Sequence, residues 1–285
     1  MKAVIDLARF FASHPLTRAT PIKAWSRYLS WQIKSRIRDE VIVSWIGGQR
    51  LAIKRGMTGA TGNVYAGLHE FSDMMFLLHF LRAGDLFMDI GANVGTYTVL
   101  ASGVCRALTC AFEPDPGAAR ALRRNVALNS LDDLVTLHTF VLGDCDGEVP
   151  FTVGLDTMNK VVAAEGQLNV RILPQHRLDT VIGESTPIMI KLDVEGYEEN
   201  VLRGAATVLA RTHLQAIELE TTTPTIENML SHNGFERRYY DPFSRLLARQ
   251  PIDVPSANSL FVRESAFIIS RVEAAKKIKV LDRMI

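Results

Sequence analysis

The stretch Asp89-Ile90-Gly91-Ala92-Asn93-Val94-Gly95-Thr96 decides the fold, because it joins a strand to a helix through a glycine turn. The short apolar run at residues 86–90 predicts the strand, and residues 94–102 can form the helix. Gly91 and Gly95 allow the backbone to turn sharply, and their lack of a Cβ lets a ligand come close. The free amides at the start of the helix then point toward that ligand.

Strand and helix patterns alternate on both sides of this turn. Further short apolar runs predict strands at residues 108–112, 135–142, 188–192, 214–219, 235–240 and 259–262. Apolar residues at helical spacing predict helices at residues 71–81, 117–129, 198–209 and 225–232. Because near-continuous apolar strands alternate with helices, we expect an α/β fold. Its core is a doubly wound, mostly parallel seven-stranded sheet with helices on both faces.

This central domain is predicted to cover residues 61–265, between a helical and hairpin extension at residues 1–60 and an amphipathic tail at residues 266–285. In the extension, residues 41–53 read as a β-hairpin that turns at Gly47-Gly48. The glycine-rich residues 56–69 predict a loop.

Two further segments depart from the alternation of strands and helices. Asp146-Gly147 is a turn signal before a strand at residues 149–153, and the polar stretch at residues 154–175 predicts a loop near a site. In the tail, residues 276–281 predict an exposed amphipathic helix.

Composition narrows the function classes. A chain with 47% hydrophobic and 22% charged residues is an ordinary globular protein, and a net charge of +1 gives no general attraction for nucleic acid. Three cysteines without CxxC spacing predict neither a disulfide framework nor a zinc site. Apolar runs fall short of a membrane span, and the first residues lack the pattern of a signal peptide. We therefore expect a cytoplasmic enzyme.

Residues 1–40 are an exception to this balanced charge. They contain eight basic residues and three acidic ones, together with apolar residues mostly at helical spacing between Ile22 and Ile37. This pattern fits a helical cap whose aromatic face packs on the core. It also fits a surface for peripheral contact with a membrane or an acidic glycan.

The strand ends predict a nucleoside pocket. Glu113 ends the second strand, 18 residues after Gly95, where a carboxylate can accept hydrogen bonds from both ribose hydroxyls. Asp144 follows the third strand and can accept from an adenine amine. The chain has neither GxGxxG nor GxxxxGK[ST], so a diphosphate cradle is absent. An adenosine with a short arm without phosphate fits best, and S-adenosylmethionine (SAM) is the obvious candidate. Glu70, with His69, could close over the amino-acid arm.

Met88-Asp89-Ile90-Gly91-Ala92-Asn93-Val94-Gly95-Thr96-Tyr97-Thr98 resembles motif I of the FkbM family of SAM-dependent methyltransferases. Ala111-Phe112-Glu113-Pro114-Asp115, Leu122-Arg123-Arg124-Asn125 and Asn129 follow the same pattern. The most specific block is Ile190-Lys191-Leu192-Asp193-Val194-Glu195-Gly196-Tyr197-Glu198, continued by Leu202-Arg203-Gly204-Ala205. The resemblance extends over residues 70–265 or so.

This resemblance implies a Rossmann-like class I methyltransferase that moves a methyl group to a hydroxyl, often of a sugar or a polyketide-like product. We expect the acceptor to be a small molecule, sugar, glycan or glycolipid. The residues expected to contact the cofactor are Glu70, Asp89, Gly91, Ala92, Asn93, Gly95, Glu113, Asn125, Asp144 and Asp193.

The chemistry requires an activated hydroxyl, because an alkyl hydroxyl is a poor nucleophile until it loses its proton. Asp193 is the candidate to orient or deprotonate the acceptor. Glu195 could assist, or could cap the helix that begins near Tyr197. Lys191 reads as a paired or snorkelling lysine. We predict no metal, although Asp193, Glu195, Glu218 and Glu220 could converge on one.

Two other functions compete with this prediction. Asp144-Cys145-Asp146 is a formal DxD, which in a metal-dependent glycosyltransferase holds a divalent ion on a sugar-nucleotide diphosphate. A SAM-binding protein without catalytic activity would keep the same pocket.

Overall fold

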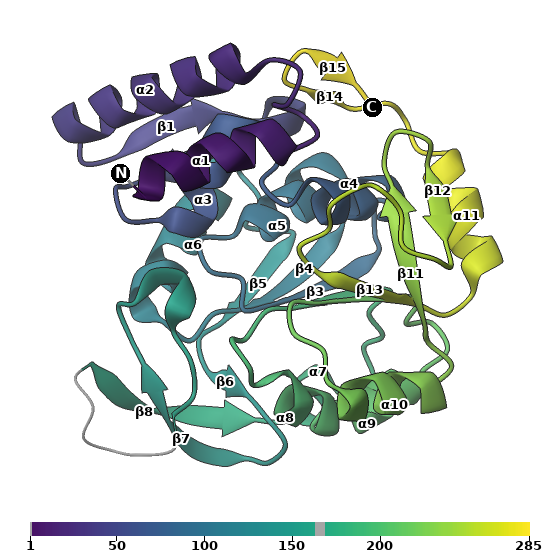
Figure 1. The fold of residues 1–285 in the computed structure, drawn as a ribbon. Helices are drawn as coiled ribbons and strands as arrows, with labels where there is room; N and C mark the ends of the chain where they lie inside the picture. The colour runs from purple at the N-terminus through teal and green to yellow at the C-terminus, as the bar shows by residue number, and fades with distance from the viewer. Residues whose placement is uncertain (1, 163–168) are drawn as a thin grey trace.

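The structure is a computed structural model that describes residues 2–162 and 169–285. Its centre is one large sheet with helices on both faces (Figure 1), in the order β12-β11-β13-β10-β9-β3-β4-β5. The strands are β3 (Leu86–Ile90), β4 (Leu108–Phe112), β5 (Val135–His138), β9 (Met189–Leu192), β10 (Ala216–Leu219), β11 (Glu236–Asp241), β12 (Leu246–Ala248) and β13 (Ser259–Val262). The predicted α/β class is confirmed. The sheet has eight strands rather than seven, because residues 246–248 fold back on β11 as an antiparallel edge strand.

Five neighbouring strands, β10, β9, β3, β4 and β5, are parallel, and β13, β11 and β12 form an antiparallel edge. The chain leaves β3 toward β4 and later returns to β9 on the other side of β3. The junction of β3 and β9 is therefore the topological switch point, where ligands bind in open α/β sheets.

The helices form two layers. One face of the sheet carries α4 (Phe71–Phe80), α5 (Thr96–Thr98) with its π-helical continuation (Val99–Val104), and α6 (Pro116–Leu128). The other face carries α7 (Leu178–Ile182), α8 (Glu198–Arg203), α9 (Ala206–Ala210) and α10 (Pro224–His232). Alternate strand residues serve the two layers: Met189 packs in the cluster with Phe76 of α4, and Ile190 packs in the cluster with Leu202 of α8.

The helix predicted at residues 198–209 is two helices, α8 and α9. The helix is interrupted at Gly204, where an added Cβ would lie 1.9 Å from the carbonyl oxygen of Gly143. The backbone of another segment thus lies directly against the junction, and this contact has no counterpart in the local sequence pattern.

The N-terminal extension shares a core with the sheet. It contains α1 (Lys2–Ser13), α2 (Pro21–Ile37), β1 (Val41–Ser44), β2 (Arg50–Ile53) and α3 (Thr58–Ala66). Phe11 and Trp31 are buried in one cluster with Ala111 of β4. The predicted hairpin is confirmed, but a short 3₁₀ turn (Ile46–Gly48) connects its strands instead of a two-residue turn.

The prediction of a loop at residues 56–69 is wrong, because most of this segment is helix α3. Gly62 lies directly against the ring of His69, where an added Cβ would be 2.2 Å from Nδ1, and Ala60, Tyr65 and Ala66 are buried. Close packing at Gly62 and burial of its neighbours outweigh the weak helical propensity of glycine.

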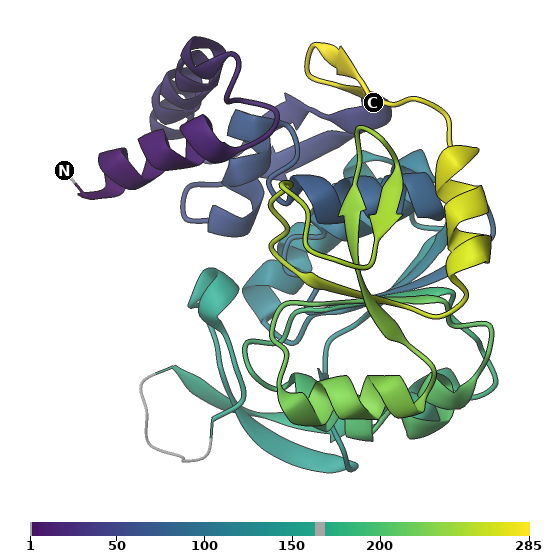
Figure 2. The ribbon, with the colours of Figure 1, turned by 45° about the vertical axis from the view of Figure 1, so that its right-hand side comes forward.

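A second, three-stranded sheet stands apart from the first (Figure 2), in the order β6-β8-β7. Its strands are β6 (Val141–Leu142), β7 (Gly147–Thr152) and β8 (Val170–His176). The strand predicted at residues 135–142 therefore splits between two sheets. The predicted turn at Asp146-Gly147 is confirmed. The stretch predicted as a polar loop contains a short 3₁₀ helix (Asp156–Met158) and β8, and its residues 163–168 lie outside the described residues.

The C-terminal residues form α11 (Ser265–Glu273) and a small hairpin, β14 (Lys279–Val280) with β15 (Arg283–Met284). The prediction of an amphipathic helix at residues 276–281 is wrong. The segment contains β14, in which Lys279 is exposed and Val280 is buried, the alternation of a strand. Within the described ranges, no helix has the length and apolar character to cross a membrane. All three cysteines are free thiols.

Candidate active site

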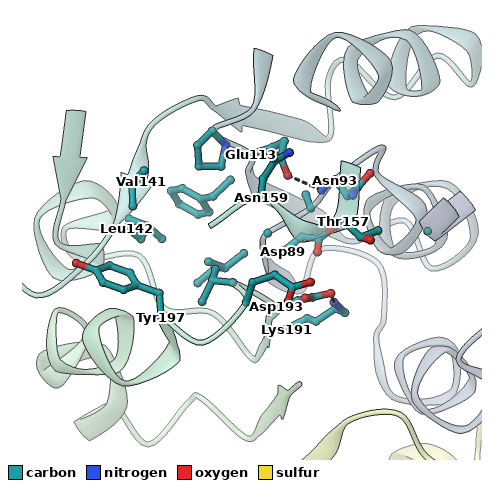
Figure 3. Close-up of a pocket in the computed structure, with 18 of the residues that line it drawn as sticks. Asp89, Asn93, Glu113, Val141, Leu142, Thr157, Asn159, Lys191, Asp193 and Tyr197 are labelled. Carbon is teal, nitrogen blue, oxygen red and sulfur yellow. Dashed lines mark hydrogen bonds and ion pairs between the residues drawn. The ribbon is translucent and has the colours of Figure 1, made fainter. Parts of the chain in front are cut away.

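A cavity lies at the carboxyl ends of β3, β4 and β9, at the switch point of the sheet (Figure 3). Its walls come from the turns that follow these strands, from residues 140–142, and from Thr157, Asn159 and Val161. Gly59 of α3 and Glu70, just before α4, also border it. The predicted residues that line it are Glu70, Asp89, Gly91, Ala92, Asn93, Glu113, Asp193 and Glu195.

The turn after β3 is fixed by backbone atoms. The amides of Gly91 and Ala92 both donate to the carbonyl oxygen of Phe112 at 3.0 Å. Gly91 has φ +80°, and an added Cβ would lie 1.7 Å from the carbonyl oxygen of Asp193. Only glycine fits there, so the turn after β3 and the turn after β9 pack directly against each other.

Glu113 ties the end of β4 to this turn. Its Oε2 accepts from the amide of Asn93 at 2.7 Å, and its Oε1 accepts from the amide of Asp115 at 2.8 Å. The side chain is buried, and burial raises the pKa of Glu113 to about 7 although these two amide bonds favour the charged form. The carboxylate is thus held in one orientation at the cavity wall.

Three ionisable residues form a row across neighbouring strands. In the register of the sheet, Lys191 of β9 lies between Asp89 of β3 and Glu218 of β10. All three residues are almost fully buried. Lys191 Nζ donates to Asp193 Oδ2 at 2.7 Å and lies 4.7 Å from the centre of the Tyr97 ring. The predicted pairing of Lys191 is confirmed, and its partner is the candidate catalytic residue.

The charges around Lys191 set its protonation and that of Asp193. Burial alone would lower the pKa of Lys191, but the carboxylates of Asp193, Glu70 and Asp89 outweigh it and raise that pKa. For Asp193, burial is the largest single effect and favours the neutral form, but the ammonium of Lys191 and the hydrogen bonds with Glu220 and Lys191 together outweigh it and lower the pKa. Asp193 is therefore held as a carboxylate by a lysine that stays charged.

A second group of carboxylates lies beside this pair. Oxygen atoms of Asp193, Glu195 and Glu220 all lie within 4.8 Å of one another, a spacing that a cation could bridge. Burial, a hydrogen bond with Asp193 and its negative charge raise the pKa of Glu220 to about 8. Glu218 does not join this group. It is fully buried, and neither of its carboxyl oxygens has a hydrogen-bond partner among the described residues.

Glu195 does not cap the helix that follows. Tyr197 precedes α8 without a side-chain cap, and Glu198 Oε1 accepts weakly from the amides of Val194 and Gly196. Glu195 itself has φ +52°, a conformation that costs free energy for a residue with a side chain. The tight turn that carries it places its carboxyl at the cavity.

Glu70 closes the side of the cavity nearest α4. Its Oε2 accepts from the Tyr97 hydroxyl at 2.5 Å and from Asn258 Nδ2 at 3.0 Å. These contacts orient the carboxylate at the cavity wall. His69 is not among the lining residues and packs against Gly62 and the ring of Phe10 instead.

Three predicted cofactor contacts, Gly95, Asn125 and Asp144, lie outside the cavity, and the first two are buried behind the turn after β3. Gly95 packs against Leu122, which an added Cβ would approach to 2.8 Å. Asn125 is buried and joins two segments, accepting from the amide of Ala52 and donating to the carbonyl of Val94. Both residues support the turn after β3 from behind and do not border the ligand space.

Asp144 is exposed, and its Oδ2 lies 3.5 Å from Asn200 Nδ2. Its neighbour in the formal DxD, Asp146, accepts from His176 Nδ1 at 3.1 Å. Neither aspartate lines the cavity. The short β6 strand turns away from the central sheet into the second one, and this redirection carries Asp144 away from the predicted adenine contact.

Thr157 and Asn159 are cavity residues that the sequence did not indicate. They belong to the polar stretch after β7. The amide of Gly154 donates to Asp115 Oδ2 at 2.8 Å and fastens the start of that stretch near the end of β4. The available signal was the polar, aperiodic composition of residues 154–175, which indicated a loop near a site but no individual residue.

The family model of the methyltransferase FkbM domain matches residues 89–239. The chain belongs to this family. The matched range begins at the glycine turn and includes β9, β10 and the carboxylates that follow them.

A curated relative is the hexuronic acid methyltransferase AglP of Haloferax volcanii, 26% identical over 145 residues. The match covers 50% of this chain and 59% of AglP, so it spans little more than half of that relative.

Among solved structures, the match to a precorrin-6y C5,15-methyltransferase of Geobacter metallireducens covers 74% of this chain and 91% of that structure, with 13% identity and a TM-score of 0.41. The match to TYW2 of M. jannaschii in complex with AdoMet covers 79% of this chain and 84% of that structure, with 12% identity and a TM-score of 0.41.

Proposed function

We propose that this methyltransferase transfers a methyl group from SAM to a hydroxyl oxygen of a sugar, a glycan or a glycolipid. The observation that carries the proposal is the placement of Glu113. Each of its oxygens accepts one backbone amide and so retains a second lone pair, and the residue lines the cavity. Two acceptor oxygens on one fixed carboxylate match the two neighbouring hydroxyls of a ribose.

The rest of the cavity wall fits the other parts of an adenosine-type cofactor. Phe112, Phe140, Val141 and Leu142 provide an apolar wall suited to a purine ring. The carboxylate of Glu70 stands at another wall and suits the ammonium group of an amino-acid arm. No basic side chain is clustered at the glycine turn to neutralise a diphosphate: within the described cavity lining, Lys191 is the only lysine or arginine, and it is paired with Asp193.

When bound, SAM supplies a methyl group already activated by its sulfonium. The chain must then position the acceptor and remove its proton. Asp193, kept charged by Lys191, is placed to orient an acceptor hydroxyl. Glu220, with a pKa of about 8, is the member of the group that becomes able to take up a proton as the pH rises through 8. Glu195 completes the acidic wall that the acceptor would meet.

Support for a sugar as the acceptor comes from AglP, whose name describes methylation of a hexuronic acid. A glycosyltransferase is not supported, because neither aspartate of the formal DxD borders the cavity.

The test is a methyl-transfer assay with tritium-labelled SAM against hexuronic acids, neutral sugars and glycolipids. The matched control for each acceptor is the same compound with its hydroxyl already methylated. We expect label in an O-methyl ether of one acceptor class, identified by mass spectrometry, and none in the blocked control. Label on nitrogen or carbon would contradict O-methylation. Calorimetry that detects binding of a sugar nucleotide but not of S-adenosylhomocysteine would contradict the cofactor.

A further inference from the structure

Helix α2 has two apolar faces, and only one of them is covered. Its buried residues are Ala24, Trp31 and Ser35, which face the core. Ile22, Leu29 and Ile33 each precede one of these buried residues by two positions. A two-residue step turns a helix by roughly 200°, so these three side chains lie on the opposite face.

This second face is exposed to solvent. Ile22, Leu29, Ile33 and Ile37 are 83%, 56%, 62% and 76% exposed. We call these four residues the α2 outer row. It spans roughly 22 Å along the helix at 1.5 Å per residue. Figures 1 and 2 both show α2 at the outside of the molecule. The aromatic residues of the same helix turn inward, where Trp25 contacts Phe11 and Tyr28 contacts Tyr65.

The surroundings of the α2 outer row are basic. Residues 1–40 carry eight basic and three acidic residues, a net charge of +5, whereas the other 245 residues carry 24 basic and 28 acidic residues, a net charge of −4. Lys34, Arg36 and Arg38 are exposed at the end of α2, and in the described part of the chain none of them forms an ion pair. Arg36 follows Leu29 by seven residues and so borders the same face.

We propose that the α2 outer row and the basic residues beside it bind the surface of an anionic lipid bilayer. An exposed aliphatic row flanked by lysine and arginine is the pattern of a helix that lies in the plane of a membrane interface. Charge favours this partner over a second copy of the chain, because pairing two such faces would bring two segments of net charge +5 together. Anionic headgroups would instead neutralise the excess charge.

The test is co-sedimentation of the full chain with vesicles of phosphatidylcholine alone or mixed with phosphatidylglycerol. We expect binding only to the mixed vesicles, and we expect high salt to weaken it. Leu29→Ser/Ile33→Ser removes the centre of the row and lowers the partition coefficient at least about tenfold. Lys34→Glu/Arg36→Glu lowers it as well. Because these side chains are exposed, the fold is expected to survive, and affinity for S-adenosylhomocysteine serves as the check.

The matched control is Ile172→Ser, which removes a 45% exposed isoleucine of β8 on a different part of the molecule and should leave vesicle binding unchanged. The proposal is overturned if the wild-type chain does not bind mixed vesicles, or if Leu29→Ser/Ile33→Ser binds them equally well. It is also overturned if sedimentation equilibrium shows a wild-type dimer that this double variant converts to a monomer, because a second copy would then cover the row.

Discussion

At the ends of β3 and β4 the cavity is fixed mainly by backbone atoms, whereas at the end of β9 it is fixed by charged side chains, with Glu220 of the neighbouring β10 turn beside them. On the first side, the amides of Gly91, Ala92 and Asn93 make the contacts that hold the turn and Glu113 in place. On the second side, Lys191 holds Asp193, and Glu220 shares a hydrogen bond with the same aspartate. The first side is suited to bind one cofactor in one pose, and the second to change protonation during a reaction.

Gly91→Ala should have the largest effect, because Gly91 is where the two sides touch. The added Cβ would lie 1.7 Å from the carbonyl oxygen of Asp193, at φ +80°, so both turns must move. We expect affinity for S-adenosylhomocysteine, measured by calorimetry, and methyl transfer each to fall by more than about 100-fold, with a lower melting temperature.

Gly147→Ala is the control for that substitution, because an added Cβ there meets no atom within 4 Å. It should behave like the wild-type chain. Wild-type affinity in Gly91→Ala would contradict the close packing of the two turns.

Asp193→Asn should separate the two sides. It keeps the shape of the side chain but removes the charge that Lys191 stabilises, so we expect kcat to fall by about 10²–10⁴-fold. Affinity for S-adenosylhomocysteine should stay close to the wild-type value, because the backbone contacts around Glu113 remain. Calorimetry and single-turnover kinetics would measure the two effects. An equal loss of affinity and turnover would assign Asp193 a structural role.

Glu113→Ala should give the opposite result. Loss of a charge-assisted hydrogen bond costs about 1.5–3 kcal/mol, or roughly 10–100-fold in affinity for the cofactor. Because burial raises the pKa of Glu113 to about 7, the wild-type carboxylate is progressively protonated as the pH falls through 7. Wild-type affinity should therefore decline below pH 7, and that decline should be absent in Glu113→Ala. Equal affinities of the two proteins at pH 8 would remove Glu113 from the site.

Glu220→Gln should have the smallest effect, confined to the pH profile. With a pKa of about 8, Glu220 becomes a carboxylate, and so a base, only as the pH rises through 8. We expect wild-type kcat to increase over that range and the increase to disappear in the variant. Glu195→Gln should retain the increase, because the hydrogen bond between Glu220 and Asp193 remains. A profile unchanged by Glu220→Gln would leave Asp193 as the proton acceptor.

The side built from backbone atoms was the easier one to predict from the sequence. Residues 86–90 and 108–112 are observed as β3 and β4 with the predicted bounds, because each is a short apolar run bounded by turn signals. Gly91, Asn93 and Glu113 line the cavity as expected, since their positions depend only on where these strands end.

The residues that could not be predicted depend on contacts distant in the sequence. Thr157 and Asn159 reach the cavity because Gly154 is bound to Asp115, 39 residues away. Asn125 occupies a position typical of the family, but its amide joins β2 to the turn after β3, and no local pattern distinguishes that role from a ligand contact. Asp144 leaves the predicted site because β6 pairs with β8 and not with β5.

The crystal structure of the complex with S-adenosylhomocysteine tests the central claim most directly. We expect both ribose hydroxyls within hydrogen-bonding distance of the Glu113 carboxylate, the purine beside Phe140 and Leu142, and the sulfur directed toward Asp193. A ligand bound away from the ends of β3 and β4, or a ribose that does not contact Glu113, would contradict the account.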